Sequence, residues 1–212
     1  MQQLQPDFPP APVHHLAHLD RVSRPFASVD RLPADRAEMV AMVRDLCLVL
    51  DGINVSQHDP EGGGWSKRVI LTESGLERPD RPATVVGFFG LKRRDASDES
   101  VAAIDEMNDL LIDRFASFPP VRGYVSRVLA DETNYANLVV MDNSEAIGTW
   151  RSQLPHTEAA GVLSESFYAN VRIYNGHLAA GFSVPDAMSL RVAKYWDYRT
   201  DPHWKAIRQL VD

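Results

Sequence analysis

The chain has 212 residues, 44% of them hydrophobic and 24% charged, which is the composition of a folded globular protein and not of a disordered chain. Its formal net charge of −7 disfavours nucleic-acid binding, because affinity for phosphates needs clustered Lys and Arg. No apolar run approaches the roughly 20 residues that cross a bilayer, and the N-terminus lacks the basic and apolar regions of an export signal, so we expect a cytoplasmic protein with no membrane contact.

Residues 1–33 are predicted to form an extended, proline-rich arm. Six prolines interrupt this stretch, and no helical or strand period repeats in it. His14, His15 and His18 lie in the arm, but they would converge on a metal only in a helix, so a packed or solvated arm is the favoured interpretation.

Residues 34–82 are predicted to add one helix and one strand. Apolar residues recur every three or four positions from Asp35, which we expect to cap the helix, to Leu50. The single cysteine, Cys47, lies in this helix, where a small buried residue is the expected role. One cysteine also excludes an internal disulfide and fits a reducing compartment. The strand is expected at Lys67–Thr72.

Residues 83–177 carry the most regular pattern. A strand is followed by a helix capped by Ser97, a hairpin, a helix capped by Ser144 and a closing strand. The expected strands are Ala83–Lys92, Tyr124–Leu129, Tyr135–Met141 and Phe167–Tyr174. The last strand is expected to end at Asn175-Gly176, a strong hairpin signal. The order β-α-β-β-α-β predicts a ferredoxin-like α+β unit.

Helices in such a unit lie on one face of the sheet, and the other face has to be covered. We expect that face to carry Val86, Phe88 and Val139. Two sheets packed face to face would cover it, so the pattern predicts a homodimer. Residues 178–212 are expected to form a further strand and a short terminal helix that pack on this unit.

Within the segment from Asn134 to Gly176, D-N-S-E-A at 142–146 is followed by Trp150 and His156. This pattern resembles dimeric α+β barrel proteins of the antibiotic-biosynthesis-monooxygenase and haem-degrading-monooxygenase type, which carry a similar D-S-E-E-A, W and H pattern on the helix after their third strand. The resemblance covers fewer than half of the residues, and Trp150 and His156 lie closer together than in that family. It implies a dimeric α+β barrel with haem as a cofactor, His156 as the ligand of the haem iron, and Trp150 beside the substrate.

Alternation along the second hairpin strand places Tyr135, Asn137 and Val139 on one face. With Arg127 from the neighbouring strand they would give an apolar wall with a few polar groups, as small-molecule pockets have. A packed core with tyrosine hydroxyls at its rim has the same pattern. The candidate catalytic residues are therefore His156, Tyr135 and Asn137, and the candidate cofactor contacts are His156, Trp150 and Arg127.

The favoured hypothesis is an enzyme that carries out a haem-dependent or monooxygenase-like step on a small apolar or aromatic molecule. Two alternatives stay open: a non-catalytic haem- or metabolite-binding protein, and a cofactor-free cyclase or isomerase that uses His156 and a tyrosine. A histidine at this position would equally fit a helix cap or a solvent-facing residue. No hydrolase, kinase or dinucleotide-binding motif occurs.

Overall fold

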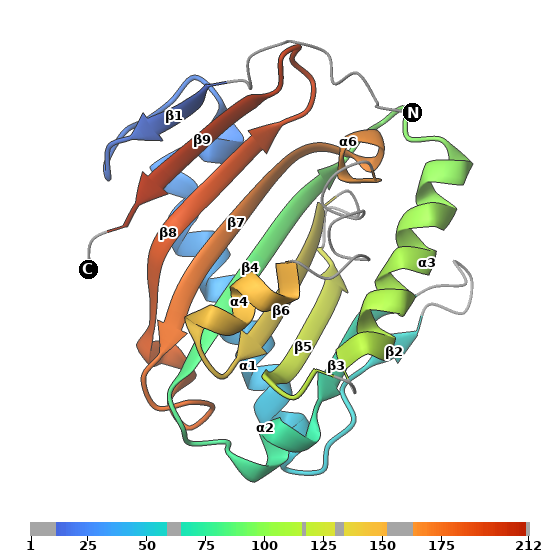
Figure 1. The fold of residues 1–212 in the computed structure, drawn as a ribbon, viewed down its shortest axis with the longest axis vertical. Helices are drawn as coiled ribbons and strands as arrows, with labels where there is room; N and C mark the ends of the chain where they lie inside the picture. The colour runs from blue at the N-terminus through green and yellow to red at the C-terminus, as the bar shows by residue number, and fades with distance from the viewer. Residues whose placement is uncertain (1–11, 59–64, 116–117, 130–133, 152–162, 211–212) are drawn as a thin grey trace, which may run out of the picture.

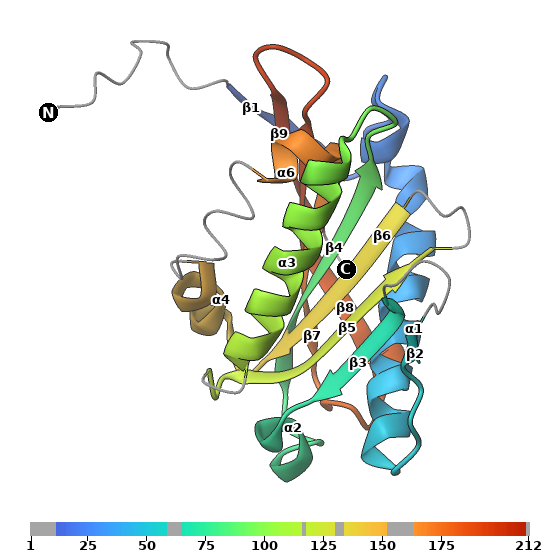
Figure 2. The ribbon, with the colours of Figure 1, turned by 90° about the vertical axis from the view of Figure 1, so that its right-hand side faces the viewer.

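The structure, a computed structural model, describes residues 12–58, 65–115, 118–129, 134–151 and 163–210. They form one nine-stranded sheet with helices on both faces, which confirms the α+β class (Figures 1 and 2). None of the described helices is long and apolar enough to span a membrane.

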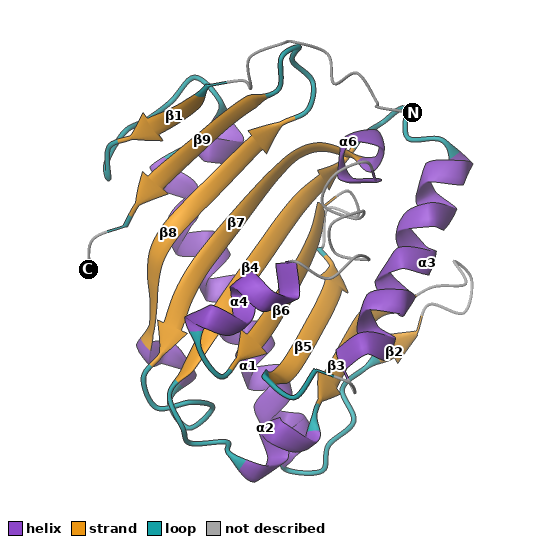
Figure 3. Ribbon diagram, in the orientation of Figure 1, coloured by secondary structure: helices purple, strands orange, loops and turns teal. Residues whose placement is uncertain are grey.

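The sheet is almost entirely antiparallel, and only its edge pair β1 and β9 is parallel. In the order in which they lie side by side (orange in Figure 3), the strands are β1 (Val13–Leu16), β9 (Trp204–Gln209), β8 (Met188–Asp197), β7 (Tyr168–Leu178), β4 (Ala83–Lys92), β6 (Asn134–Met141), β5 (Val121–Val128), β3 (Trp65–Leu71) and β2 (Gln57–His58). The described α-helices are α1 (Leu32–Leu50), α2 (Glu73–Glu77), α3 (Asp98–Phe115), α4 (Ser144–Arg151) and α6 (Ser164–Phe167), and 3-10 helices lie at Pro25–Ala27, Val29–Arg31 and Pro185–Ala187.

Helix α1 packs against one face of the sheet, behind it in Figure 1. Its Met39, Val43 and Leu46 are fully buried, and burying each such side chain contributes about 1.5–3 kcal/mol. Gly87 of β4 lies under the helix, where an added Cβ would come within 2.5 Å of the Met39 sulfur. This glycine therefore lets α1 lie close to the sheet.

Helices α3, α4 and α6 lie on the opposite face (Figure 2). Phe115 of α3 stacks on Trp150 of α4 with ring centroids 5.1 Å apart. Phe167 of α6 meets Tyr168 of β7 edge to face at 4.8 Å. These two aromatic contacts belong to separate buried clusters, one at each end of α3.

The expectation of a helix-free face is wrong, because α1 covers the face that was expected to need a second copy. Val86, Phe88 and Val139 point to the other side, toward α3 and α4, while their sequence neighbours Val85 and Val140 are fully buried on the α1 side. The physical reason given for a homodimer is thereby lost, and the homodimer itself stays a prediction.

Two predicted helix caps differ in detail. Helix α1 starts at Leu32 with Pro33 in its first turn, and Asp35 is buried instead of capping. Helix α4 starts at Ser144 as predicted, but the residue before it makes the cap, since the Asn143 Oδ1 accepts a hydrogen bond from the Ala146 N–H at 3.0 Å. Ser97 does cap α3: its Oγ accepts from the Ser100 N–H at 3.2 Å.

The predicted turn at Asn175-Gly176 is wrong, because β7 runs through it to Leu178. The pairing with β8 shifts register here, and a Cβ on Gly176 would come within 2.4 Å of the Ser189 carbonyl oxygen. A glycine inside a strand often marks such a bulge or close approach. The chain turns later, where Gly181 has a φ of +55°.

The predicted terminal helix is also wrong, because this segment forms strand β9. Arg208 of β9 is fully buried and donates hydrogen bonds to the carbonyl oxygens of Ala17, His18, Asp20 and Ala27. These bonds fasten the first described residues to the sheet, where Val13–Leu16 form β1 within the predicted arm.

Candidate ligand-binding face

The middle of the sheet presents six half-buried side chains on the side of α3 and α4. They form two rows across β6, β4 and β7, namely Val139–Val86–Asn175 and Asn137–Phe88–Ile173. We call these six residues the central face. Their period-two alternation with fully buried neighbours follows from the pleat of each strand, which sends successive side chains to opposite faces.

Aromatic side chains border one end of the central face. Phe88 meets Tyr168 edge to face at 5.2 Å, and Tyr135 meets Phe167 of α6 at 5.6 Å. Burial, together with the nearby Asp105 carboxylate of α3, raises the pKa of Tyr135 above its ordinary value. The phenol therefore stays protonated at neutral pH, where it can donate a hydrogen bond but is a poor base.

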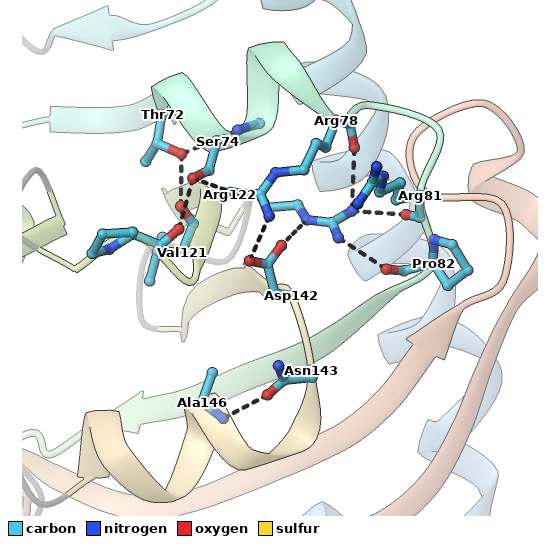
Figure 4. Close-up of polar contacts among 12 residues, drawn as sticks. Thr72, Ser74, Arg78, Arg81, Pro82, Val121, Arg122, Asp142, Asn143 and Ala146 are labelled. Atoms are coloured by element: carbon cyan, nitrogen blue, oxygen red, sulfur yellow. Dashed lines mark hydrogen bonds and ion pairs between the residues drawn. The ribbon is translucent and has the colours of Figure 1, made fainter.

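The other end is bordered by α4, whose start is held by a partly buried ion-pair network (Figure 4). Asp142, the residue after β6, accepts from the Arg122 Nε at 2.5 Å and from the Arg78 Nη1 at 3.1 Å. The remaining Arg122 nitrogens donate to the carbonyl oxygens of Arg78, Arg81 and Pro82, just before β4. Charge-assisted hydrogen bonds are short and directional, so this network sets the position of α4 relative to β4 although the Arg78 Nε is buried without a partner.

The structure brings some of the predicted site residues together. Tyr135 and Asn137 share the α3 and α4 side of the sheet, with Asn137 in the central face. Arg127 lies on the opposite side, where its guanidinium contacts Glu38 at 2.6 Å and Asp45 at 2.5 Å on α1. It therefore holds α1 to β5 and does not contribute to the central face. His156 lies outside the described residues.

Trp150 is a core residue in this structure. It is 5% exposed and packs between Phe115 and Phe118, whose ring centroids lie 5.1 Å and 5.3 Å away. Trp150 and Arg127 are both predicted to contact one cofactor, but the first is enclosed by aromatic rings and the second lies on the other face of the sheet. These two residues therefore do not line one site, and a haem cofactor and its ligation by His156 stay predictions.

Asn175 is the main residue of the central face that sequence reasoning missed, because Asn175-Gly176 was assigned to a turn. The available signal was the alternation of Val171, Ile173, Asn175 and His177, which continues past the supposed turn. Asn175 of β7 lies opposite Val86 of β4, and no local sequence pattern predicts this pairing between distant strands.

No family model and no curated protein sequence matches the chain. Among solved structures, protein SO0527 from Shewanella oneidensis is similar, with a TM-score of 0.41 and 10% sequence identity. The match covers 54% of this chain and 99% of that one. A likeness at this level identifies neither a family nor a function, so the candidate site rests on its own geometry.

Proposed function

We propose that the segment from β4 to β7 is a ferredoxin-like unit that binds a small, mainly apolar molecule on its central face. The strand order β7-β4-β6-β5, with antiparallel pairing throughout, supports the unit, as does the location of α3 and α4 on one face. Strands β8, β9 and β1 extend the sheet at one edge, and β3 and β2 extend it at the other.

The observation that carries the binding proposal is the composition of the central face. Four apolar side chains form a strip with an amide on each side, Asn137 on β6 and Asn175 on β7. Neighbouring strands lie about 4.8 Å apart and a residue rises about 3.4 Å along a strand, so two strand spacings and a two-residue offset separate these amides by about 12 Å. A flat apolar ligand with hydrogen-bonding groups at both ends suits this strip, because each amide both donates and accepts.

In this proposal the small molecule binds to the central face without a haem cofactor. Phe88, Val86 and Ile173 supply the apolar contact, and the protonated Tyr135 hydroxyl at the border is a further donor for the ligand. Half-buried apolar side chains on a sheet face are costly to hydrate, and a ligand that covers them gains about 25 cal/mol per Å² of apolar surface removed from water, before the cost of association is subtracted.

A fluorescence titration with the uncharged dye N-phenyl-1-naphthylamine tests this function. We expect a saturable rise in dye emission, because the dye is flat and apolar. Val86→Lys places an ammonium in the middle of the central face and should weaken the dye at least about tenfold, or about 1.4 kcal/mol. Val86→Trp fills the same place without adding charge and should also reduce binding.

Val184→Lys is the matched control, because Val184 is 47% exposed and lies outside the central face. It adds the same charge and should leave the dye affinity unchanged. Circular dichroism of each variant checks that it folds. Equal dye binding by the native protein and both folded Val86 variants would refute the assignment of the ligand to this face.

A further inference from the structure

A hollow of ≈ 510 Å³ lies between α2, the start of β5 and the last turns of α3, away from the central face. Its apolar lining residues are Ile70, Leu71, Ile112, Phe115, Pro119 and Val121, and its polar lining residues are Thr72, Glu73, Ser74 and Glu77. Small-molecule sites commonly have about 300–1,000 Å³, so this volume suits a ligand of one or two rings.

Ring packing and hydrogen bonds hold the floor and wall of the hollow. Phe115 and Val121 are buried in the floor, and Phe115 stacks on Trp150. In the wall, the Thr72 Oγ1 donates to the Val121 carbonyl oxygen at 2.6 Å, and the Ser74 Oγ donates to the Pro119 carbonyl oxygen at 2.7 Å (Figure 4). These bonds dock α2 onto the chain before β5, so a ligand would meet a preformed site with little ordering cost.

The two ionisable lining residues of the hollow, Glu73 and Glu77, are both acidic. The nearby Arg78 donates to the lining Ser74 Oγ at 2.8 Å and is paired with Asp142. Glu73 and Glu77 lie one helical turn apart on α2, and like charges at this spacing repel each other. No ion pair joins either carboxylate to a described residue, and none of the described lining residues is Lys or Arg. A cation at the rim would relieve the repulsion while its apolar body covers Ile112 and Phe115.

We propose that the hollow between α2 and α3 is a second binding site, which takes a small organic ammonium ion with an apolar body. Glu73 and Glu77 recognise the ammonium, and the floor of Ile112, Phe115 and Val121 recognises the apolar part. The site does not depend on the central face, because the packed rings of Phe115, Tyr124 and Trp150 lie between the two.

Three ligands of one shape and different charge test the proposal: 1-naphthylmethylamine, 1-naphthylmethanol and 1-naphthoate. Titrations followed by ¹H–¹⁵N NMR at pH 7 report both affinity and location. We expect shifts of the amides of Thr72–Glu77 and of the last turn of α3. The amine should bind up to about fivefold more tightly than the alcohol, and the carboxylate most weakly, since one exposed ion pair is worth up to about fivefold.

Glu73→Gln/Glu77→Gln should remove the preference for the amine and leave the alcohol unaffected. Glu99→Gln/Glu106→Gln removes the same charge from α3 outside the lining and should keep the preference. Ile112→Trp should fill the hollow and abolish binding of all three. Equal binding of amine and alcohol by the native protein would overturn the ligand class, and amide shifts elsewhere with none at Thr72–Glu77 would overturn the site.

Discussion

Asp35 and Arg172 form the most enclosed ion pair among the described residues. Arg172 of β7 donates to the Asp35 carboxylate of α1 through Nε at 2.5 Å and Nη2 at 2.9 Å, and the Tyr174 hydroxyl donates to it at 2.7 Å. The two charged residues are 4% and 2% exposed. Both pair members are therefore needed, because either one alone would be a buried, uncompensated charge.

Asp35→Ala should lower the free energy of unfolding by about 3–5 kcal/mol, since it strands the Arg172 guanidinium in the core. Guanidinium chloride unfolding followed by circular dichroism measures the loss. Asp51→Ala is the matched control at the exposed C-terminal end of α1 and should change stability by less than about 0.5 kcal/mol. Similar small losses for both variants would show that the pair does not hold α1 to the sheet.

The environment of Asp197 predicts that the free energy of unfolding depends on pH. Burial alone would raise the pKa of this carboxyl, but hydrogen bonds from Arg199 and Arg24 outweigh burial and lower it below the ordinary value. A lowered folded-state pKa gives stability that is fully present above the unfolded pKa of about 4 and is lost as the pH falls through the folded pKa.

Asp197→Asn should therefore cost about 1–3 kcal/mol at pH 7, and the difference from the native protein should shrink below about pH 4. Urea unfolding at pH 7, 4 and 3 measures it. A difference that stays constant or grows toward pH 3 would contradict the assigned role.

At the scale of elements, replacing either of two glycines by alanine should change the stability in opposite directions. Gly148 lies within α4 with nothing within 4 Å of an added Cβ, whereas a Cβ on Gly176 of β7 would come within 2.4 Å of the Ser189 carbonyl oxygen. Gly148→Ala should stabilise by about 0.5–1 kcal/mol, because alanine loses less entropy in a helix. Gly176→Ala should destabilise by about 1–3 kcal/mol through overpacking. Thermal melting measures both, and shifts of the same sign would contradict the strand and helix placement.

Elements with strong local signals were predictable from the sequence. The β-branched run Ala83–Lys92 forms β4 with the predicted bounds, and Ser97 caps α3 as its spacing indicated. Local reasoning failed where a tertiary contact outweighs the local signal. Asp35 has the character of a helix cap but pairs with Arg172, and Gly176 allows close approach to β8 instead of a turn.

At the scale of the molecule, alternation along β6 predicted that Tyr135, Asn137 and Val139 share a face, and the structure places them so. The position of α1 was not predictable, because an amphipathic pattern shows that a helix has a buried side but does not show which surface it covers. Two separate facts were therefore missed: α1 covers the face that was expected to be free of helices, and Val86 lies on the opposite face, beside α3 and α4.

The most direct test of the binding proposal is a ¹H–¹⁵N NMR titration of the native protein with N-phenyl-1-naphthylamine. Binding at the central face predicts saturable shifts of the amides of Thr84–Phe88, Asn137–Val139 and Ile173–Asn175, with the α1 amides unchanged because the sheet separates them from the ligand. Saturable shifts confined to other parts of the chain, or no saturable shift at all, would contradict it.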